Sequence, residues 1–361
     1  MKRIALWQIW ILIVSSPLFS TPLQDRPRLV HADSLVYRQY TDQVVQDLWG
    51  NVEFVQDSAS LTCQHARWWR TDNRLRLEKN VTIDDGKRIL KGQLVIYEGE
   101  NRIEKALGQV TLFSNDQILH SHKLTYWQED QIAEATDSVS VESEKDSIRI
   151  ECGFLRYDRK QDYGLLLKDP VLIKFDTTET ENIVIHGDTM QIWGDSLHVM
   201  INGEVQIQKG DITATCKQAE YWSGKDQLIL TQLPIVYYDE QQMQGDSVCV
   251  ELDGTRFKGV ELIGKSEIRS TDSTSTNVDR LQGRQILMSD LEDSVRTITI
   301  EGQAISEYNV TEEATDSESE TGFNKVTGDR IILTFINKKI KRVRVESDPG
   351  LCTGEFKPDE K

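Results

Sequence analysis

The segment GEVQIQKGDITATCKQAEYW, residues 203–222, contains two stretches of alternating apolar residues on either side of Lys209-Gly210-Asp211. Alternation with a period of two predicts two β-strands, and the central glycine predicts a tight turn between them. Cys216 lies in the middle of the second strand. Comparison with the rest of the chain explains why a cysteine is tolerated there.

The same pattern recurs ten times along the chain, at a spacing of about 30 residues. One position in every copy holds a small residue. These residues are Ala32, Cys63, Gly92, Ser121, Cys152, Gly187, Cys216, Gly245, Gly283 and Gly328. Cys216 is therefore one occupant of a column that requires smallness, and no reactive thiol is needed to explain it.

Apolar residues lie an even number of positions before the small residue and an odd number after it. Around Cys216, Ala214 lies two positions before it, and Ala219 and Tyr221 lie three and five positions after it. A strand with a period of two can turn both sets inward only if it bends or bulges between them. The sequence therefore predicts a corner at Cys216, with Ala214, Ala219 and Tyr221 all facing inward.

Repeats that each bury one bent strand must stack on their neighbours. Residues 28–356 are predicted to form an all-β domain, an elongated V-shaped β jelly roll or β-solenoid of about ten repeats of roughly 30 residues. Polar stretches predict a candidate module boundary near 176–182 and loop insertions at 270–277 and 311–322, and 357–361 is a tail.

The N-terminus has Lys2 and Arg3, followed by an apolar run from Ile4 to Val14 and small residues near Ser20. This arrangement is typical of a secretory signal peptide covering residues 1–20. The run is shorter than the roughly 20 residues that span a bilayer, which favours cleavage, and a retained N-terminal anchor is the alternative. Either outcome places the β domain outside the cytoplasm.

The chain is acidic, with 42 Lys and Arg residues against 59 Asp and Glu residues and a net charge of −17. Removal of the predicted signal peptide would leave 40 basic residues and a net charge of −19. Such a surface argues against nucleic acid as a partner, because binding to phosphates depends on Lys and Arg.

The segments GEVQIQKGDITATCKQAEYW and GNVEFVQDSASLTCQHARWW, together with the tenfold repetition, resemble the OstA/LptA family of periplasmic carriers in lipopolysaccharide export. The resemblance implies a non-enzymatic β jelly roll in the periplasm whose apolar interior shields acyl chains. It also implies end strands that pair with related β domains, among them the membrane-anchored LptC. Ten repeats are about twice the number expected of a single carrier domain.

Apolar residues of the repeats are the candidate lining of a lipid-binding groove. They are Val30, Leu35, Tyr37, Val52, Phe54, Leu61, Leu90, Leu94, Tyr97, Val110, Leu112, Leu119, Leu124, Tyr126, Ile150, Ile185, Val205 and Ile207. The alternative is that these side chains fill a closed β-sandwich core. The candidate pairing strands are residues 29–37 and 340–346, and the second overlaps the basic, alternating KKIKRVRV segment.

No catalytic, phosphate-binding or cofactor-binding motif is present, and no cofactor is expected. His120 and His122 lie two residues apart, but no further ligands at metal-binding spacing accompany them. Among the five cysteines, only Cys216 and Cys249 lie in adjacent repeats, close enough for a disulfide to be considered.

The function expected from these features is that of a periplasmic lipid carrier or bridge, which shields lipopolysaccharide acyl chains on the way to the outer membrane. Two alternatives are an LptC-like component anchored in the inner membrane and facing the periplasm, and a surface or scaffold β-solenoid that binds no lipid.

Overall fold

A computed structural model gives the structure of most of the chain. It describes residues 27–56, 58–114, 117–175, 181–194, 198–238, 240–271, 278–289, 295–310, 322–336, 339–348 and 350–358. The predicted signal peptide lies outside these residues, as do 176–180, 272–277 and 311–321 from the predicted boundary and loops. Within the described ranges, no helix is long and apolar enough to cross a membrane.

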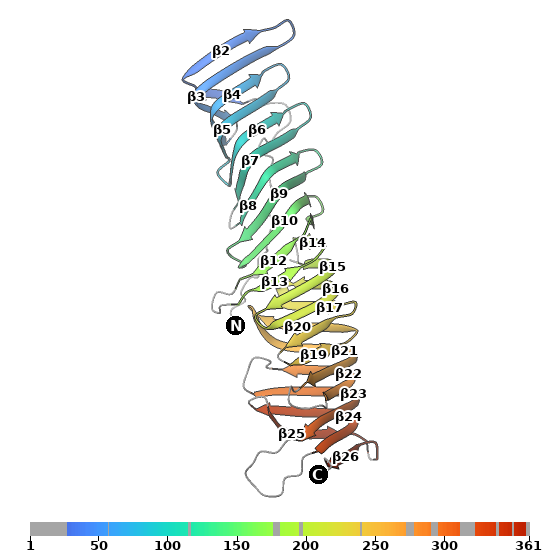
Figure 1. Cartoon of the computed structure of the whole chain (residues 1–361). Helices are drawn as coiled ribbons and strands as arrows, with labels where there is room; N and C mark the ends of the chain where they lie inside the picture. The colour runs from blue at the N-terminus through green and yellow to red at the C-terminus, as the bar shows by residue number, and fades with distance from the viewer. Residues whose placement is uncertain are drawn as a thin grey trace, which may run out of the picture. The chain divides into compact units, whose positions relative to one another are not determined.

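The chain divides into two units, of which unit 1 comprises Met1–Lys174 and Asp188–Val199. The strands of unit 1 are β1 (Arg28–His31), β2 (Ser34–Gln39), β3 (Val44–Gln56), β4 (Ala59–Trp69), β5 (Arg74–Asp84), β6 (Arg88–Glu98), β7 (Ile103–Ser114), β8 (Gln117–Trp127), β9 (Ile132–Ser143), β10 (Ile148–Asp158), β11 (Tyr163–Leu167), β12 (Val171–Lys174) and β14 (Thr189–Trp193). Figure 1 shows β3 to β10 stacked in the order in which they follow along the chain.

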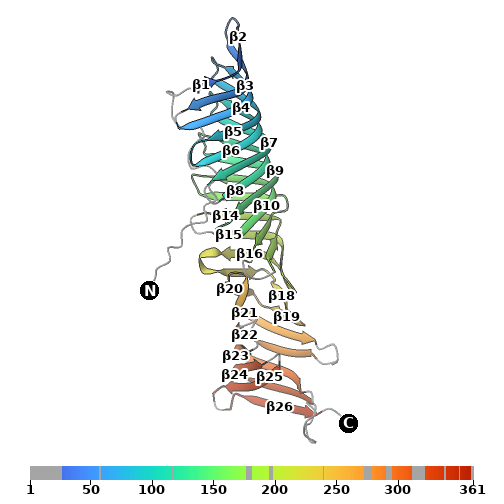
Figure 2. The same ribbon diagram turned by 90° about the vertical axis from the view of Figure 1, so that its left-hand side faces the viewer.

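Unit 2 comprises Phe175–Gly187 and Met200–Lys361. Its strands are β13 (Ile183–His186), most of β15 (His198–Lys209), β16 (Ile212–Trp222), β17 (Gln227–Thr231), β18 (Ile235–Tyr238), β19 (Gln241–Gln244), β20 (Ser247–Asp253), β21 (Arg256–Thr271), β22 (Val278–Ser289), β23 (Val295–Val310), β24 (Gly322–Ile336), β25 (Lys339–Glu346) and β26 (Thr353–Pro358). Figure 2 shows β21 to β24 stacked in sequence order. The last strand continues two residues beyond 356, into the predicted tail.

Each repeat consists of one strand that carries the small residue and one strand that returns antiparallel to it, as β4 and β5 do. Some of these strands are divided at the corner, so that β10 pairs with β11 through one half and with β12 through the other. The small-residue column falls in ten such places between β1 and β24. The prediction of an all-β fold made of about ten repeats is confirmed.

The predicted corners are present, and they are built mainly by the returning strand. In β3, Trp49 pairs with His65 of β4 and Val52 pairs with Cys63, so β3 contains one extra residue at this point. Such a β-bulge moves the inward face across by one position. Similar register shifts separate Glu78 from Val81 in β5 and Leu107 from Val110 in β7.

The backbone at these bulges adopts positive φ angles at two consecutive residues. The pairs are Gly50-Asn51, Lys79-Asn80, Gly108-Gln109, Asp137-Ser138, Lys168-Asp169, Gln232-Leu233, Gly264-Lys265 and Gly302-Gln303. Two successive left-handed residues turn the strand sharply, and residues with a side chain adopt this region at some cost. The recurrence of this pair makes the bend a regular property of the repeat.

Burial along β16 confirms the predicted parity change at Cys216. Ala214 and Cys216 are buried before the corner, and Ala219 and Tyr221 are buried after it. Lys217 and Gln218 lie between the two sets and are less buried. The strand therefore keeps its apolar side chains inside on both sides of the bend.

The corners divide unit 1 into two walls that face each other. Wall 1 is formed by residues 52–56, 59–63, 81–84, 88–92, 110–114, 117–121, 139–143 and 148–152. Wall 2 is formed by residues 44–49, 66–69, 74–78, 94–98, 103–107, 123–127, 132–136 and 154–158. Phe54 of wall 1 and Trp68 of wall 2 make an edge-to-face contact with ring centroids 5.7 Å apart, so the apolar sides of the two walls meet.

The space around the small-residue column differs between repeats, which allows a matched test. A Cβ atom added at Gly283 would lie 2.6 Å from Cγ2 of Ile300 and 3.0 Å from the carbonyl oxygen of Glu301. At Gly92 the nearest atom, the carbonyl oxygen of Leu107, would be 3.6 Å away. An added methyl group would therefore overpack the site at Gly283, whereas the site at Gly92 has room for it.

We predict that Gly283→Ala lowers the free energy of unfolding by about 1–3 kcal/mol, because backbone and side chain must shift to admit the methyl group. Gly92→Ala should be neutral or slightly stabilising, since alanine restricts the unfolded chain. Urea titration monitored by circular dichroism measures both. Equal effects of the two substitutions would contradict the proposed packing of the corner.

Candidate functional site

Most of the predicted groove residues lie in the interior between the walls of unit 1. Three others, Ile185, Val205 and Ile207, are buried within unit 2. Thirteen of the eighteen are buried. These are Val52, Phe54, Leu61, Leu90, Val110, Leu112, Leu119, Leu124, Tyr126, Ile150, Ile185, Val205 and Ile207. In the structure as described, the interior of unit 1 is filled by its own side chains.

The other five predicted residues lie in two different places. Val30, Leu35 and Tyr37 belong to β1 and β2 and are 45–52% exposed. Leu94 and Tyr97 are half-buried. At Leu94 the adjacent Val95, which is 2% exposed, takes the inward position, because the corner turns the third residue after Gly92 inward.

A row of polar side chains lies along the edge of wall 1 that is farthest from the corners. We call this row rim 1. It is formed by the buried residues Gln56, Arg88, Ser114 and Ser143. The backbone N–H of Arg88 donates to Oδ1 of Asp85 over 2.8 Å, and its Nε donates to Oδ2 of the same carboxylate over 3.0 Å. These bonds hold a guanidinium group beside an otherwise apolar interior.

A second row, which we call rim 2, follows the free edge of wall 2. The pairing of successive strands places Tyr97, Glu104, Tyr126, Ala133 and Tyr157 in register on the inner face. The rings thus contribute apolar surface to the interior while their hydroxyl groups lie at its edge.

Two hydrogen bonds engage polar groups of rim 2. The hydroxyl of Tyr157 donates to Asp162, and the side-chain amide of Gln128 donates to Glu104. Burial raises the pKa of Tyr157, and the hydrogen bond to Asp162 raises it further. The Tyr157 hydroxyl is therefore a neutral donor at physiological pH.

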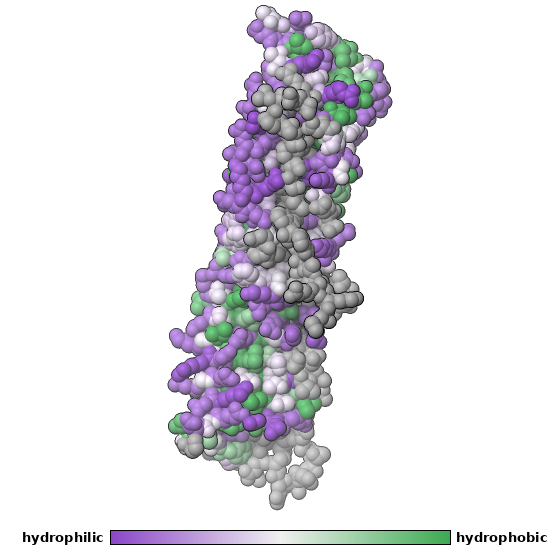
Figure 3. Space-filling view, turned by 180° about the vertical axis from the view of Figure 1, so that it is seen from behind, coloured by the Kyte–Doolittle hydropathy of each residue, from purple (hydrophilic) through white to green (hydrophobic). Residues whose placement is uncertain are grey.

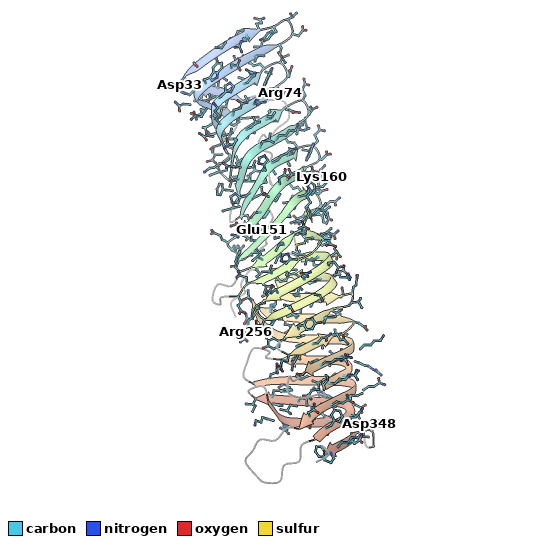
Figure 4. The ribbon with its side chains drawn as sticks, viewed as in Figure 1. Asp33, Arg74, Glu151, Lys160, Arg256 and Asp348 are labelled. Carbon is cyan, nitrogen blue, oxygen red and sulfur yellow. The ribbon has the colours of Figure 1, made fainter. Side chains whose placement is uncertain are left out.

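The positive charge of Arg88 in rim 1 influences Tyr126 in rim 2. Burial raises the pKa of Tyr126, while a hydrogen bond with Arg159 and the positive charges of Arg159 and Arg88 act in the opposite direction. Arg88 belongs to rim 1 and Tyr126 to rim 2. Arg74 and Lys160, at the hairpins next to rim 2, lie along one side of unit 1 in Figure 4.

Unit 1 therefore combines an apolar interior with a polar seam along one side. The visible face of the middle strands of unit 1 is largely hydrophilic, and hydrophobic residues gather at the end that carries β2 and β3 (Figure 3). Such an arrangement suits an amphiphile whose chains lie between the walls and whose polar group lies at the seam.

The terminal strands form a separate surface. β2 is exposed along its whole length, and so is β26. Leu35, Val36 and Tyr37 of β2 are 41–52% exposed, as is typical of a strand with a neighbour on one side only. Of the predicted pairing strands, 29–37 falls in β1 and β2, and 340–346 falls in β25.

The described residues contain no group of three His, Cys, Asp or Glu side chains arranged to hold a metal ion. The five thiols are free. Cys216 faces the interior, whereas Cys249 alternates with the buried Val248 and Val250 and lies on the opposite face of the sheet. Burial raises the pKa of the Cys216 thiol to about 11, so the thiol is protonated and a poor nucleophile at neutral pH.

Sequence reasoning missed the polar rims. Arg88, Ser114 and Ser143 come at strand ends next to polar turns, where polar residues are usually solvated, so their burial had no local signal. The rim tyrosines were available as a recurrent aromatic column, five positions after the small residue. Their position beside a turn could have indicated an edge.

Comparison with known proteins gives one family match. Residues 24–163 match the model of the family described as OstA-like protein. This part of the chain is therefore similar to OstA-like proteins. It covers most of unit 1, and the same corner and wall pattern continues beyond it into unit 2.

A solved structure of LptH from Pseudomonas aeruginosa is also similar. Its title describes the protein as the LptA-homologous periplasmic component of the conserved lipopolysaccharide transport device. The sequences are 15% identical, the match covers 41% of this chain and 95% of LptH, and the TM-score is 0.30. No curated protein matches the chain.

We predict that only Cys352, which is exposed, reacts rapidly with iodoacetamide in the folded protein at pH 8. Burial raises the pKa values of Cys63, Cys152 and Cys216 to about 11, so their thiols stay protonated and enclosed until well above this pH. Peptide mass spectrometry locates the adducts, Cys352→Ser should abolish the fast reaction, and urea should expose all five thiols. Alkylation of Cys216 as fast as that of Cys352 would show that the corner is open.

Proposed function

We propose that this protein is a non-catalytic periplasmic carrier that shields lipopolysaccharide acyl chains during transport to the outer membrane. The observation that carries the proposal is the apolar interior with its polar seam, located within the residues that the OstA-like model matches. The family resemblance identifies lipopolysaccharide as the cargo. The acyl chains of this molecule would contact the apolar interior, and its polar part would contact the seam.

The filled interior implies that cargo enters by separation of the two walls along the seam. Burying each CH₂ group of an acyl chain contributes roughly 0.8 kcal/mol. The hydrogen bonds named at the rims each lie within one wall, so separation of the walls leaves them in place. An acyl chain that enters would replace apolar contacts between the walls with apolar contacts of its own.

Exposed end strands support pairing with related β domains. β2 offers backbone groups and the apolar side chains Leu35 and Tyr37 to a further strand. Strand addition at such an edge would extend the walls, so that a chain could pass from one domain to the next. An LptC-like protein is a partner of the required kind.

Two alternatives give different observations. An inner-membrane-anchored component would retain the N-terminal segment and sediment with membranes, whereas a carrier would yield a soluble mature chain in the periplasm. A scaffold that binds no lipid would leave the inner face no more reactive toward lipid than the outer face.

The last contrast defines a matched test at two adjacent residues. Tyr126 is buried on the inner face of β8, and Trp127 is half-exposed on its outer face. Replacing either with photoreactive benzoylphenylalanine changes one aromatic side chain into another. We predict that irradiation with lipopolysaccharide gives at least tenfold more adduct at position 126 than at 127.

The pair Tyr97 and Ile96 serves as a second comparison, because Ile96 lies on the outer face of β6. Tyr37 tests whether lipid reaches the exposed end of unit 1. Equal labelling within both adjacent pairs would overturn the carrier proposal and favour a scaffold.

A further inference from the structure

The last strands of unit 2 form a sheet edge with clustered positive charge. β25 pairs with β24, which is its one partner among the strands that the structure describes. Lys341, Arg342 and Arg344 of β25 are exposed. The chain as a whole has a net charge of −17, so this edge differs from the rest of the protein.

The same edge is irregular. Arg342 pairs with Thr334 of β24 and Ile340 pairs with Phe335, so Lys341 is an extra residue in β25. The neighbouring β26 ends at Pro358, which has no N–H group to donate. Bulges, lysines and prolines are three features by which proteins prevent a further strand from adding to an edge. Together they indicate that this edge is closed to strand addition.

β2, at the start of unit 1, has none of these features. Its six residues pair with β3 in unbroken register, and Arg38 is its only charged residue. The guanidinium group of Arg38 donates to Asp47 of β3, which is 1% exposed, so a buried carboxylate compensates the charge. β1 contains a register shift. The regular and nearly neutral edge of unit 1 is therefore β2.

The inner side chains of β2 define the strand that fits it. Leu35 and Tyr37 pair with Leu48 and Gln46 of β3, and they are 45% and 52% exposed. An added strand must cover them with apolar side chains at alternate positions. β25 of a second copy fits poorly, because its bulge interrupts the ladder and its arginines would approach Arg38 on the outer face.

We propose that this protein accepts a further strand at β2 alone, and that β25 and β26 form a closed edge that ends the stack. The partner at β2 is an uncharged edge strand of a related β domain. Copies of this chain then do not join head to tail, and the largest assembly of the chain alone contains two copies joined through β2. The proposal rests on the proposed function for the pairing of end strands, and it adds the direction in which pairing can proceed.

Light scattering after size-exclusion chromatography measures the assembly of the full mature chain directly. Over a hundredfold range of concentration, we expect masses of one or two chains. A series of three or more chains would overturn the proposal, because head-to-tail addition would be needed to continue beyond two copies.

A variant without the closing features gives the positive test. It combines deletion of Lys341 with Arg342→Thr, Arg344→Thr and Pro358→Val, and circular dichroism shows whether it folds. We expect this opened variant to form assemblies of three or more chains. If the deletion prevents folding, Lys341→Thr replaces it, and a smaller increase in mass is expected because the bulge remains.

Two controls accompany the opened variant. Addition of Leu35→Lys and Tyr37→Lys places charges on the inner face of β2 and should return the opened variant to single chains. A charge-matched control removes three positive charges from exposed positions of unit 1 and should leave the mass of the wild-type chain unchanged. Its substitutions are Lys87→Thr, Lys91→Thr and Lys123→Thr.

A peptide of alternating glutamate and valine tests whether the positive edge instead attracts an acidic strand. Hydrogen exchange of residues 339–346 should be the same with and without this peptide. Protection of these amides, or failure of the folded opened variant to assemble, would overturn the closed edge. Labelling of position 126 by lipopolysaccharide does not involve this edge, so the carrier function and the closed edge can fail separately.

Discussion

The bend at the middle of each strand is the constraint on which the rest of the structure depends. A straight strand exposes alternate residues on opposite faces, so it can bury only one parity. Here the chain buries one parity before the corner and the other after it, as β16 does around Cys216. Two consecutive positive φ angles in the returning strand and a small residue in its partner make this change possible. Without the corner, half of the apolar side chains would face water.

The corner also determines where polar groups can be placed. Because each strand folds back over itself, both of its ends reach the same side of unit 1, and the side chains at those ends meet there. Arg88 from one wall and Tyr126 from the other illustrate the result. At the seam the two walls are not joined by continuous backbone, as they are at the corners. In physical terms, it is the side on which the walls can separate at the lowest cost.

The sequence predicted the repeat, the β-strands and the change in the buried parity at each corner, because each of these features recurs as a periodic pattern in ten copies. It was less reliable at single positions. Leu94 and Val95 are both apolar, and the inward one is Val95, which lies three positions after Gly92 as Ala219 lies three after Cys216. The rims depend on which strand ends the corners bring to the same side of unit 1, such as those that carry Arg88 and Tyr126, so no local pattern predicts them.

The inward thiols at the corners have a consequence for biogenesis. Cys63, Cys152 and Cys216 occupy a column that tolerates any small residue, and burial makes their thiols poor partners for disulfide exchange. In an oxidising compartment they are vulnerable only before their repeats have stacked. In the proposed periplasmic location, folding would therefore compete with oxidation, and rapid stacking of neighbouring repeats would itself protect against mispaired disulfides.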